Sequence, residues 1–281
     1  MSDVNYRTHR YHAEATALEG SLQLPLVQDI KPQAYLKVAE QGGYLSQHAE
    51  DYRLESVISF RSAYTQVAGN PDVKAGHGWS TIATSVVEGL NVLDVVTADR
   101  VVGQITVEHP LEGYVPHVTF LGTRFENLRI AGHPVNLDLD LDMFGPKPED
   151  DAPYSAAPGF LDRVAKQHGK VRTHPSLIDD LLKRYTGLGE KTEKPEAIEC
   201  SLVNNAEGSF DGKCFGHVIE VPNFGTIVLA ALRLGQGDYQ EKTGIPKSTT
   251  FHLTMIEMKM GCIAAGNAHA AKLITNGSTS P

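Results

Sequence analysis

Apolar and polar residues alternate along most of this chain, and this alternation constrains the fold more than any other feature of the sequence. Successive side chains on a β-strand point to opposite faces of the sheet, so an alternating segment gathers its apolar residues on one face. Such segments cover residues 11–27, 52–69, 80–109, 117–145 and, with interruptions, 197–274. Gly, Pro and Asn separate the segments. The pattern predicts an all-β protein, a mostly antiparallel sandwich or partial barrel.

Several segments predict particular strands and turns. Residues 11–27 form either one long strand or a hairpin that bends at Gly20, and residues 80–109 form two or three strands rich in Val, Ile and Thr. The sequence AGHP at 131–134 predicts a turn between two strands. In segment 52–69, the residues that share one parity are Leu54, Ser56, Ile58, Phe60, Ser62 and Tyr64.

One region departs from the alternation and predicts a helical insertion. It opens with the linker-like sequence GPKPEDDAPYSAAPG and continues with two helical segments, at 160–170 and 174–189. In the second segment apolar residues recur at helical spacing, Pro175 suits the first turn and Gly187 suits the C-cap. The insertion is expected either to plug one open end of the β body or to cover a ligand pocket as a lid.

These patterns predict a single domain in three stretches of sequence. Residues 1–145 form the first part of a β domain, residues 146–195 the linker and helical insertion, and residues 196–281 the second part of the β domain. A chain of 281 residues is long enough to bury a substantial core in this arrangement.

The charge and composition exclude several classes of protein. Lys and Arg number 25 and Asp and Glu number 34, so the net charge is 25 − 34 = −9, which argues against nucleic acid or an anionic membrane as partner. No apolar run approaches the roughly 18 residues of a membrane span, and no secretory leader is seen. Three cysteines, Cys200, Cys214 and Cys262, match no zinc pattern or disulfide framework. We expect a soluble, cytoplasmic protein, with export after removal of a leader left open.

The sequence NLDLDLDM at 136–143 alternates without a break and places Asp138, Asp140 and Asp142 on one face of a strand. Their spacing is nearly 7 Å, about two residues of a strand. The interpretation we favour is that water solvates this face and that Arg124 and Arg129 pair with it across the 131–134 turn.

Two other interpretations of the three aspartates stay open. Carboxylates are ligands for a divalent cation such as Ca²⁺, to which Glu126 or Asn127 would add oxygens from a neighbouring strand. The segment lacks the glycine-containing loop of an EF-hand, however, and side chains on a flat strand do not converge. Alternatively, the aspartates form an anionic contact face for another chain. A divalent cation is the only cofactor that the sequence suggests.

Histidines supply the candidate catalytic residues. His109, His117 and His133 fall within 25 residues, in a region of expected neighbouring strands, and Glu126 lies between them in sequence. Imidazoles that meet in a barrel mouth can bind Zn²⁺ or Fe²⁺ or act as general bases. The alternative is that these are separate surface and turn residues, since two of them precede proline and no HxH or HExxH motif is present.

Two function classes remain. The first, which we favour, is a non-catalytic binding or assembly protein whose edge strands and acidic faces contact copies of itself, as a homo-oligomer, or another partner. The second is a small-molecule enzyme, such as a lyase, isomerase or cyclase, with a histidine-lined cavity under the helical lid. No GxSxG nucleophile motif and no P-loop is found in the sequence.

One family resemblance can be named from residues 79–135. The sequences ATSVVEGLNVL, TADRV and FENLRIAGHPV are similar to the β-rich domain of bacterial choice-of-anchor P proteins, and FHLTMIEMKMGCIAAGNAHAA near the C-terminus resembles the last strand pair of that domain. The resemblance covers about half of the chain and implies an all-β fold and an uncharacterised bacterial protein, with no activity to carry over. Proteins of that family are typically exported, whereas this sequence has a helical insertion and shows neither a leader nor a C-terminal anchor.

Overall fold

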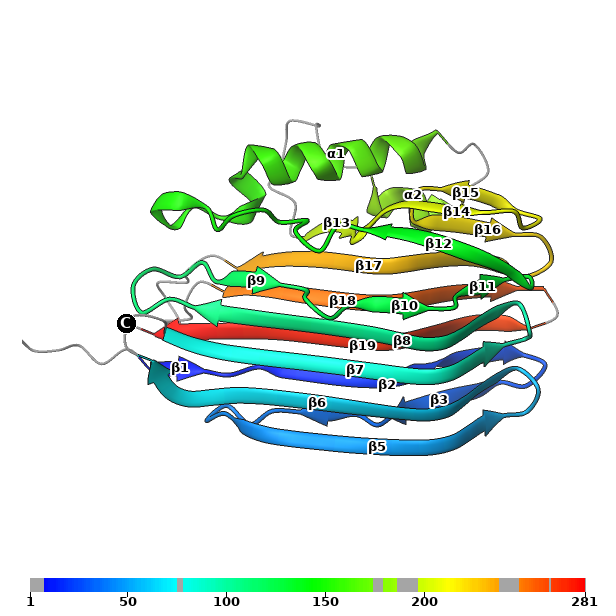
Figure 1. Cartoon of the computed structure of the whole chain (residues 1–281), viewed down its shortest axis with the longest axis horizontal. Coiled ribbons are helices and arrows are strands. Elements are labelled where there is room, and N and C mark those ends of the chain that lie inside the picture. Colours follow the sequence, from blue (N-terminus) through cyan, green and yellow to red (C-terminus); the bar gives the residue numbers. More distant parts are fainter. Residues whose placement is uncertain are drawn as a thin grey trace, which may run out of the picture.

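The computed structural model describes residues 8–74, 78–173, 179–185, 197–237, 248–262 and 264–280. Two antiparallel sheets pack face to face, and two helices lie along one side of them (Figure 1). The predicted all-β sandwich with a small helical insertion is therefore confirmed. We call the two layers the back sheet and the front sheet, as they lie in Figure 1.

The back sheet has the strand order β15-β16-β17-β18-β19-β2-β3, and β1, β4 and β13 pair with β19, β2 and β17. Its strands are β1 (Thr8–Arg10), β2 (Ala13–Leu24), β3 (Gln28–Gln33), β4 (Leu36–Lys37), β13 (Ala197–Ser201), β15 (Lys213–Phe215), β16 (Val218–Val221), β17 (Gly225–Gly237), β18 (Ser248–Gly261) and β19 (Ala265–Ser280). Because β19 pairs with both β18 and β2, the last strand of the chain joins its two ends in one sheet.

The front sheet has the order β14-β12-β11-β8-β7-β6-β5, with β9 and β10 paired to β8. Its strands are β5 (Gly43–Leu54), β6 (Ile58–Lys74), β7 (Gly78–Val92), β8 (Val96–His109), β9 (His117–Thr119), β10 (Arg124–Glu126), β11 (Arg129–Ile130), β12 (His133–Leu139) and β14 (Val203–Gly208). The strands β5 to β8 form successive hairpins, as their short connections predict.

The structure decides between the alternatives for individual segments. Residues 13–24 form one strand, and Gly20 lies so close to β19 that an added Cβ would be 2.2 Å from the Asn267 carbonyl oxygen. Residues 80–109 form two strands, and the hairpin of β11 and β12 turns at Ala131 and Gly132 as predicted. In segment 52–69, in contrast, the residues of one parity do not share one face. Leu54, Ile58 and Phe60 are buried in the core, whereas Ser62 and Tyr64 are partly exposed.

The helical insertion lies on one edge of the sandwich. It contains α1 (Pro158–Arg172), α2 (Asp179–Arg184) and two short 3₁₀ turns at Glu149–Asp151 and Tyr154–Ala156. Helix α1 covers the ends of both sheets: Gln167 Nε2 donates to the Ser201 carbonyl at 2.9 Å, and the Phe160 ring stacks on Phe144. The choice between a plug and a lid stays a prediction. The expected caps Pro175 and Gly187 lie outside the described residues.

The inner faces of the two sheets form one large apolar core, to which β2, β7, β8 and β19 contribute. Met255, Met258 and Met260 are part of it. Cys200 is buried, Cys214 and Cys262 are exposed, and none of the three forms a disulfide. No helix in the described part of the chain is long and apolar enough to span a membrane.

The back sheet bends along a line that crosses its strands, here called the back crease. At this line the inward–outward alternation of side chains shifts by one residue. Two successive rows of residues across the strands face the core there, in place of one. These rows contain Ala17, Ala230, Met255 and Ala271, then Leu18, Leu229, Ile256 and Ala270, all 0% exposed. Ala230 and Ala271 have φ values of 44° and 51°, in the left-handed region that reverses the side-chain alternation.

In the front sheet the inward–outward alternation also shifts by one residue, but there two successive rows of residues face outward. We call this line the front crease. These rows contain Glu50, Ser62, Glu88 and Arg100, then Asp51, Arg61, Gly89 and Asp99. The face that carries the additional row is the longer one and therefore the convex one. The outer face of the front sheet is accordingly convex, and the outer face of the back sheet is concave.

Small residues on the inner face of the front sheet make room for the back crease. Thr65, Ser85 and Gly103 lie opposite one another on β6, β7 and β8. A Cβ added to Gly103 would lie 3.0 Å from Met255 Cγ. The Ser85 hydroxyl donates to the Thr16 carbonyl on the back sheet at 3.0 Å. The two bent layers thus fit together with little space between them.

Candidate functional site

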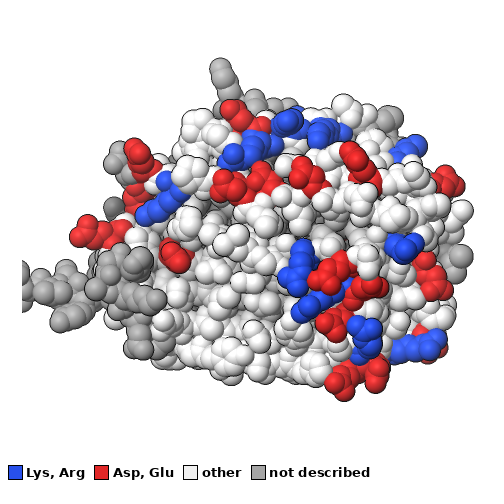
Figure 2. Space-filling model, in the orientation of Figure 1, with Lys and Arg blue, Asp and Glu red and all other residues white. Residues whose placement is uncertain are grey.

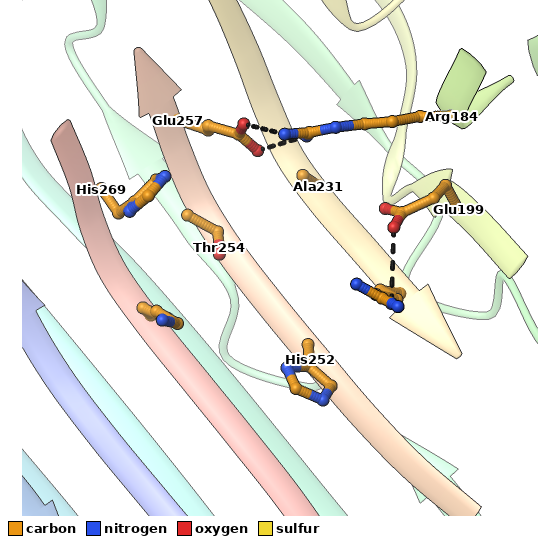
Figure 3. A pocket seen from close by; sticks show the side chains of 9 residues that line it. Arg184, Glu199, Ala231, His252, Thr254, Glu257 and His269 are labelled. Carbon is orange, nitrogen blue, oxygen red and sulfur yellow. Dashed lines mark hydrogen bonds and ion pairs between the residues drawn. The ribbon is translucent and has the colours of Figure 1, made fainter. Parts of the chain in front are cut away.

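A charged groove lies on the concave outer face of the back sheet, beside α2 (Figure 3). Its cavity volume is about 230 Å³. The lining residues are Arg184, Glu199, Ala231, Arg233, His252, Thr254, Glu257, His269 and Lys272. Seven of these nine side chains are ionisable, whereas outward positions of a sheet are more commonly a mixture of neutral and charged residues.

Three outward rows of the back sheet supply most of the lining. The first row is Glu199, Arg233 and His252, the second is Ala231, Thr254 and Lys272, and the third is Glu257 and His269. The second and third rows lie on either side of the back crease. Because the sheet is concave there, side chains from the two rows lean toward one another instead of standing parallel, and this forms the groove.

Helix α2 forms one wall of the groove because it is anchored on the back sheet. Tyr185, directly after α2, is buried against Val218 and Val228, and its hydroxyl lies 2.8 Å from His217 Nε2. Arg172 of α1 donates to the Tyr185 carbonyl at 2.7 Å. These contacts fix the end of α2, from which the Arg184 side chain extends over the sheet.

Arg184 and Glu257 form a two-pronged ion pair across the groove, shown by the dashed lines in Figure 3. The two guanidinium nitrogens lie 2.9 and 2.7 Å from the two carboxylate oxygens. The hydrogen bond to Glu257 raises the pKa of Arg184 further above its usual value. Such parallel hydrogen bonds fix geometry as well as charge, so this pair acts as a rigid wall.

Arg233 and Glu199 form a much looser pair. Arg233 Nε lies 3.5 Å from Glu199 Oε1, and the Arg233 side chain is 56% exposed. Burial raises the pKa of Glu199, against the opposing effect of the two arginines nearby. The guanidinium of Arg233 therefore retains hydrogen-bond donors that a ligand can use. Its partner Glu199 is protonated more easily than a glutamate in water, because burial raises its pKa.

The remaining polar groups differ in charge. Burial lowers the pKa of both His252 and His269, so both imidazoles are neutral near pH 7 and can each donate one hydrogen bond. Lys272 forms an ion pair with Glu19 at 2.5 Å at the far side of the groove. The lining therefore combines three cations, two carboxylates and two neutral imidazoles.

The histidines predicted to share a site do not meet. His109 ends β8 and is buried in the inner face, whereas His117 lies opposite the outward residue Glu108. His133 pairs with Ile130, which pairs with Val96 at the opposite end of β8. His109 and His133 are therefore about 40 Å apart along the strand. Glu126 lies between these positions on β10 and forms an ion pair with Arg124 at 2.7 Å.

The three aspartates do not form a metal site either. Asp138 lies on β12, but the strand ends at Leu139, and Asp142 donates its backbone N–H to the Asp140 carboxylate at 3.1 Å. No cluster of three metal-ligating side chains occurs among the residues that the structure describes. The expected pairing with Arg124 and Arg129 is also wrong, because these side chains bond to Glu126 and to the Gly132 carbonyl.

The sequence does contain a signal for the groove. Three strands of the back sheet carry two consecutive apolar residues between polar ones, in TALE (16–19), TMIE (254–257) and HAAK (269–272). Each of these is the point where the strand crosses the back crease. None of the candidate site residues predicted from the sequence lies in the groove.

Comparison with known proteins identifies one family. The family model described as a domain of unknown function, DUF8256, matches residues 9–235, which run from β1 into β17. The match includes Arg184, Glu199 and Arg233 but ends before β18 and β19. A search of curated proteins gave no match. Nothing in these results links the chain to the choice-of-anchor P proteins, so that resemblance stays a prediction. Since the match covers well over half of its 281 residues, the chain belongs to the DUF8256 family.

Proposed function

We propose that this protein is a non-catalytic binding protein that holds a small anionic molecule, with a carboxylate or phosphate group, in the groove of the back sheet. The observation that carries this proposal is the state of Arg233. Its guanidinium is more than half exposed, faces the groove and has one distant carboxylate contact, at 3.5 Å. A planar guanidinium with free donors is well suited to bind a carboxylate or phosphate through two hydrogen bonds.

The charges around Arg233 support an anionic ligand. The whole chain has a net charge of −9, yet the groove lining has three cations against two carboxylates, with the third cation, Lys272, paired to Glu19 at the far side of the groove. Glu257 is engaged by Arg184, and the pKa of Glu199 is raised by burial. A concave site of this kind concentrates the field of its cations, which favours an anion over a cation or a neutral molecule.

The size of the groove limits the ligand. Pockets for drug-sized ligands and cofactors have volumes of about 300 to 1,000 Å³. The cavity volume here is about 230 Å³, and one side is open to solvent. The proposed ligand is therefore a small acid or phosphate ester, and a dinucleotide would be too large.

Titration calorimetry with inorganic phosphate and with small mono- and dicarboxylates tests the proposal. We expect Arg233→Ala to weaken binding of the best of these anions at least tenfold. Arg61→Ala is the matched control, because Arg61 is an exposed arginine on the front sheet that pairs loosely with Glu88 at 3.5 Å. Equal affinity in both variants and the wild type, or no binding of any of these anions at millimolar concentration, would falsify the proposal.

Proton linkage provides a second test at the same site. Arg184, Arg233 and Glu257 are the charged groups that affect Glu199, and burial keeps the pKa of Glu199 raised. A bound anion favours the protonated form of Glu199, so affinity should increase as the pH falls from 8 to 5. Glu199→Gln should bind the anion several-fold more tightly at pH 7 and lose part of this pH dependence. An unchanged pH profile would contradict the role of Glu199.

One observation favours the enzyme alternative as second candidate. Glu199 and His252 lie in the same row of the groove, and burial shifts their pKa values in opposite directions, up for Glu199 and down for His252. Such pairs are typical of acid and base groups in active sites. If the groove is catalytic, native mass spectrometry and NMR will show that the bound acid is converted; an unchanged acid supports the binding protein.

Self-association of the chain remains a further prediction. Strand β5 is 12 residues long, pairs only with β6 among the described strands, and exposes Tyr44 and Leu45. Long exposed edge strands are templates for pairing with a second chain. Sedimentation velocity at increasing protein concentration tests this, and a constant monomer mass would exclude it. The cytoplasmic location also stays a prediction.

A further inference from the structure

The front sheet is incompletely closed between β10 and β12. Strands β10 and β11 both pair with β8, one after the other. Strand β12 starts as the hairpin partner of β11, at His133 and Pro134, and one further backbone hydrogen bond joins Val135 to Leu128. From Asn136 onward β12 pairs with β14 instead. In the described part of the chain, β10 and β12 therefore each have a paired edge and an edge that faces the other strand without pairing.

A slot lies between these two edges. It has a cavity volume of about 440 Å³, larger than that of the charged groove. Six of its nine lining residues are apolar. The lining residues are Arg124, Phe125, Asn127, Leu128, Pro134, Val135, Asn136, Leu137 and Leu139. Phe125, Leu137 and Leu139 pack against the core but remain partly exposed, so the floor of the slot is an incompletely covered part of the core.

The shape and chemistry of the slot indicate what it can bind. Two facing strand edges present backbone N–H and C=O groups at the spacing of an extended chain, and these groups are costly to leave without partners in a partly buried site. An inserted strand would bond to both edges and cover the apolar floor with every second side chain. Four residues of β12, Asn136 to Leu139, span about 13 Å, which corresponds to a short peptide segment.

The charges on the rim restrict the peptide further. Asp138 on β12 is exposed and lies between the lining residues Leu137 and Leu139, and Asp140 and Asp142 follow after the end of the strand. On the other side, the Arg124 guanidinium is engaged by the Glu126 carboxylate at 2.7 Å and the Gly122 carbonyl at 3.1 Å. The unneutralised charge of the rim is therefore negative. Outward-facing side chains of an inserted strand would gain attraction if they were basic.

We propose that the slot between β10 and β12 binds one extended segment of a partner protein as an additional strand, with apolar side chains toward the core and Lys or Arg side chains toward Asp138 and the aspartates that follow it. This gives the NLDLDLDM sequence a second role. Leu137 and Leu139 form part of the floor of the slot, and the aspartates select the charge of the partner.

Fluorescence anisotropy with a labelled, end-blocked peptide of alternating Lys and Val, about seven residues long, tests this directly. We expect saturable binding that weakens at least tenfold when the Val amides are N-methylated, because methylation removes the hydrogen-bond donors of the peptide. We also expect a peptide with Asp in place of Lys to bind at least tenfold more weakly. A methylated peptide that binds as well as the parent would overturn the proposal, as would absence of binding at millimolar peptide.

Variants on the two sides of β12 locate the binding site. Asn136→Trp fills the slot from an exposed position and should weaken binding at least tenfold. Asn205→Trp is the matched control, because Asn205 is exposed on β14, opposite Asp138 and outside the slot. Circular dichroism and melting temperature establish that both variants fold, and Asp138→Asn with Asp140→Asn provides a surface change that should weaken binding several-fold.

The same variants distinguish a partner from a second copy of this chain. If the wild type forms dimers that Asn136→Trp abolishes, then the slot is filled by another copy and the proposed partner is wrong. If Asn136→Trp and Asn205→Trp reduce peptide affinity equally, the peptide binds elsewhere and the slot is not its site. Loss with Asn136→Trp alone, in a monomeric protein, supports the proposal.

Discussion

The outer faces of the two sheets differ in both shape and charge. On the front sheet, the three outward rows on one side of the crease carry no Lys, Arg, Asp or Glu on β5 to β8. They are Tyr44, Ala68, Ile82 and Thr106, then Ser46, Gln66, Thr84 and Gln104, then His48, Tyr64, Val86 and Val102. Figure 2 shows this uncharged area, with charged residues gathered to one side of it. The back sheet, in contrast, has ionisable residues in most outward rows.

Both patterns follow from the direction of the bend. On the convex front face the two outward rows of the crease diverge, so charged residues such as Asp51, Arg61 and Asp99 remain accessible to water. On the concave back face the rows beside the crease converge, so ionisable residues such as His269 lose water and their pKa values shift. The same type of residue is thus a solvated surface group on one sheet and part of a site on the other.

The largest effect on stability is expected when the pH is lowered. This change tests how far helix α2 shields the back face from water. Burial lowers the pKa of His217, under α2, to about 3, from an unfolded value near 6.5. The unfolded chain therefore binds more protons between these values, so stability is complete above pH 6.5 and is lost as the pH falls toward 3. The expected loss at pH 4 is about 3 kcal/mol from this residue.

Urea unfolding from pH 7 to pH 4 measures this loss. His217→Gln should show a smaller slope of unfolding free energy against pH than the wild type, whatever its stability at pH 7. Since His109, on the inner face of the front sheet, is also buried and has a pKa lowered to about 3, His109→Gln should reduce the slope similarly. The control is His133→Gln, at an exposed position. If the slope is the same in His133→Gln and His217→Gln, then α2 leaves His217 accessible to water.

The fit between the two bent layers is tested next, at Gly103. A Cβ at this position would lie 3.0 Å from Met255 Cγ and 3.2 Å from Leu273 Cδ1. Gly103→Val should therefore lower the unfolding free energy by about 2–3 kcal/mol, as overpacking of a core does. Gly235→Val on β17 is the control, because the nearest atom to its added Cβ is 3.8 Å away. Equal losses, measured by chemical denaturation, would mean that the two layers are not closely fitted at the crease.

Ion pairs on the two faces should differ in strength. A double-mutant cycle with Arg184→Met and Glu257→Gln should give a coupling energy of about 1 kcal/mol, because the pair is two-pronged and partly buried. The cycle with Arg61→Met and Glu88→Gln on the front sheet should give about 0.3 kcal/mol, since Arg61 is 70% exposed and the distance is 3.5 Å. Equal coupling energies would remove the distinction between the convex and the concave face.

The smallest effect is expected for the same substitution on each face. Thr84→Lys adds a charge to the uncharged area of the front sheet and should change stability by less than about 0.5 kcal/mol. Thr254→Lys places a fourth cation in the groove, opposite Lys272, and should cost about 0.5–1 kcal/mol while it tightens anion binding. Thermal unfolding with and without phosphate measures both effects. A larger loss for Thr84→Lys would indicate that another molecule covers the front face.

Much of the fold follows from local sequence patterns. Alternation predicted the strands, the hairpin at 131–134 and the all-β class, because burial of one face of a strand requires that pattern. The errors in assigning faces have one cause. In segment 52–69, Leu54 and Ile58 pair across the β5–β6 hairpin and both face the core, so the hairpin leaves the parity unchanged. The doubled polar residues Arg61 and Ser62 then reverse the face, so Tyr64 points outward.

Catalytic and metal sites were harder to predict because they depend on convergence. His109 and His133 are close in sequence but lie at opposite ends of β8. Glu199 and Lys272 are far apart in sequence, yet β17 and β18 bring them to one groove. Sequence spacing along an extended strand converts to a large distance, about 3.3 Å per residue, so proximity in sequence is a poor guide within a sheet.

Local sequence patterns specify that sheets form and where the helical insertion interrupts them. They also specify which positions double the alternation: two apolar residues in TALE, TMIE and HAAK, and two polar residues at Glu50–Asp51 and Asp99–Arg100. The alignment of these positions across neighbouring strands into creases, and the location of α2 beside one of them, depend on the tertiary fold. The physical reason is that each doubling acts on a single strand, whereas curvature of a sheet and the meeting of charges in a groove depend on register between strands, which is fixed by pairings between distant segments of the chain.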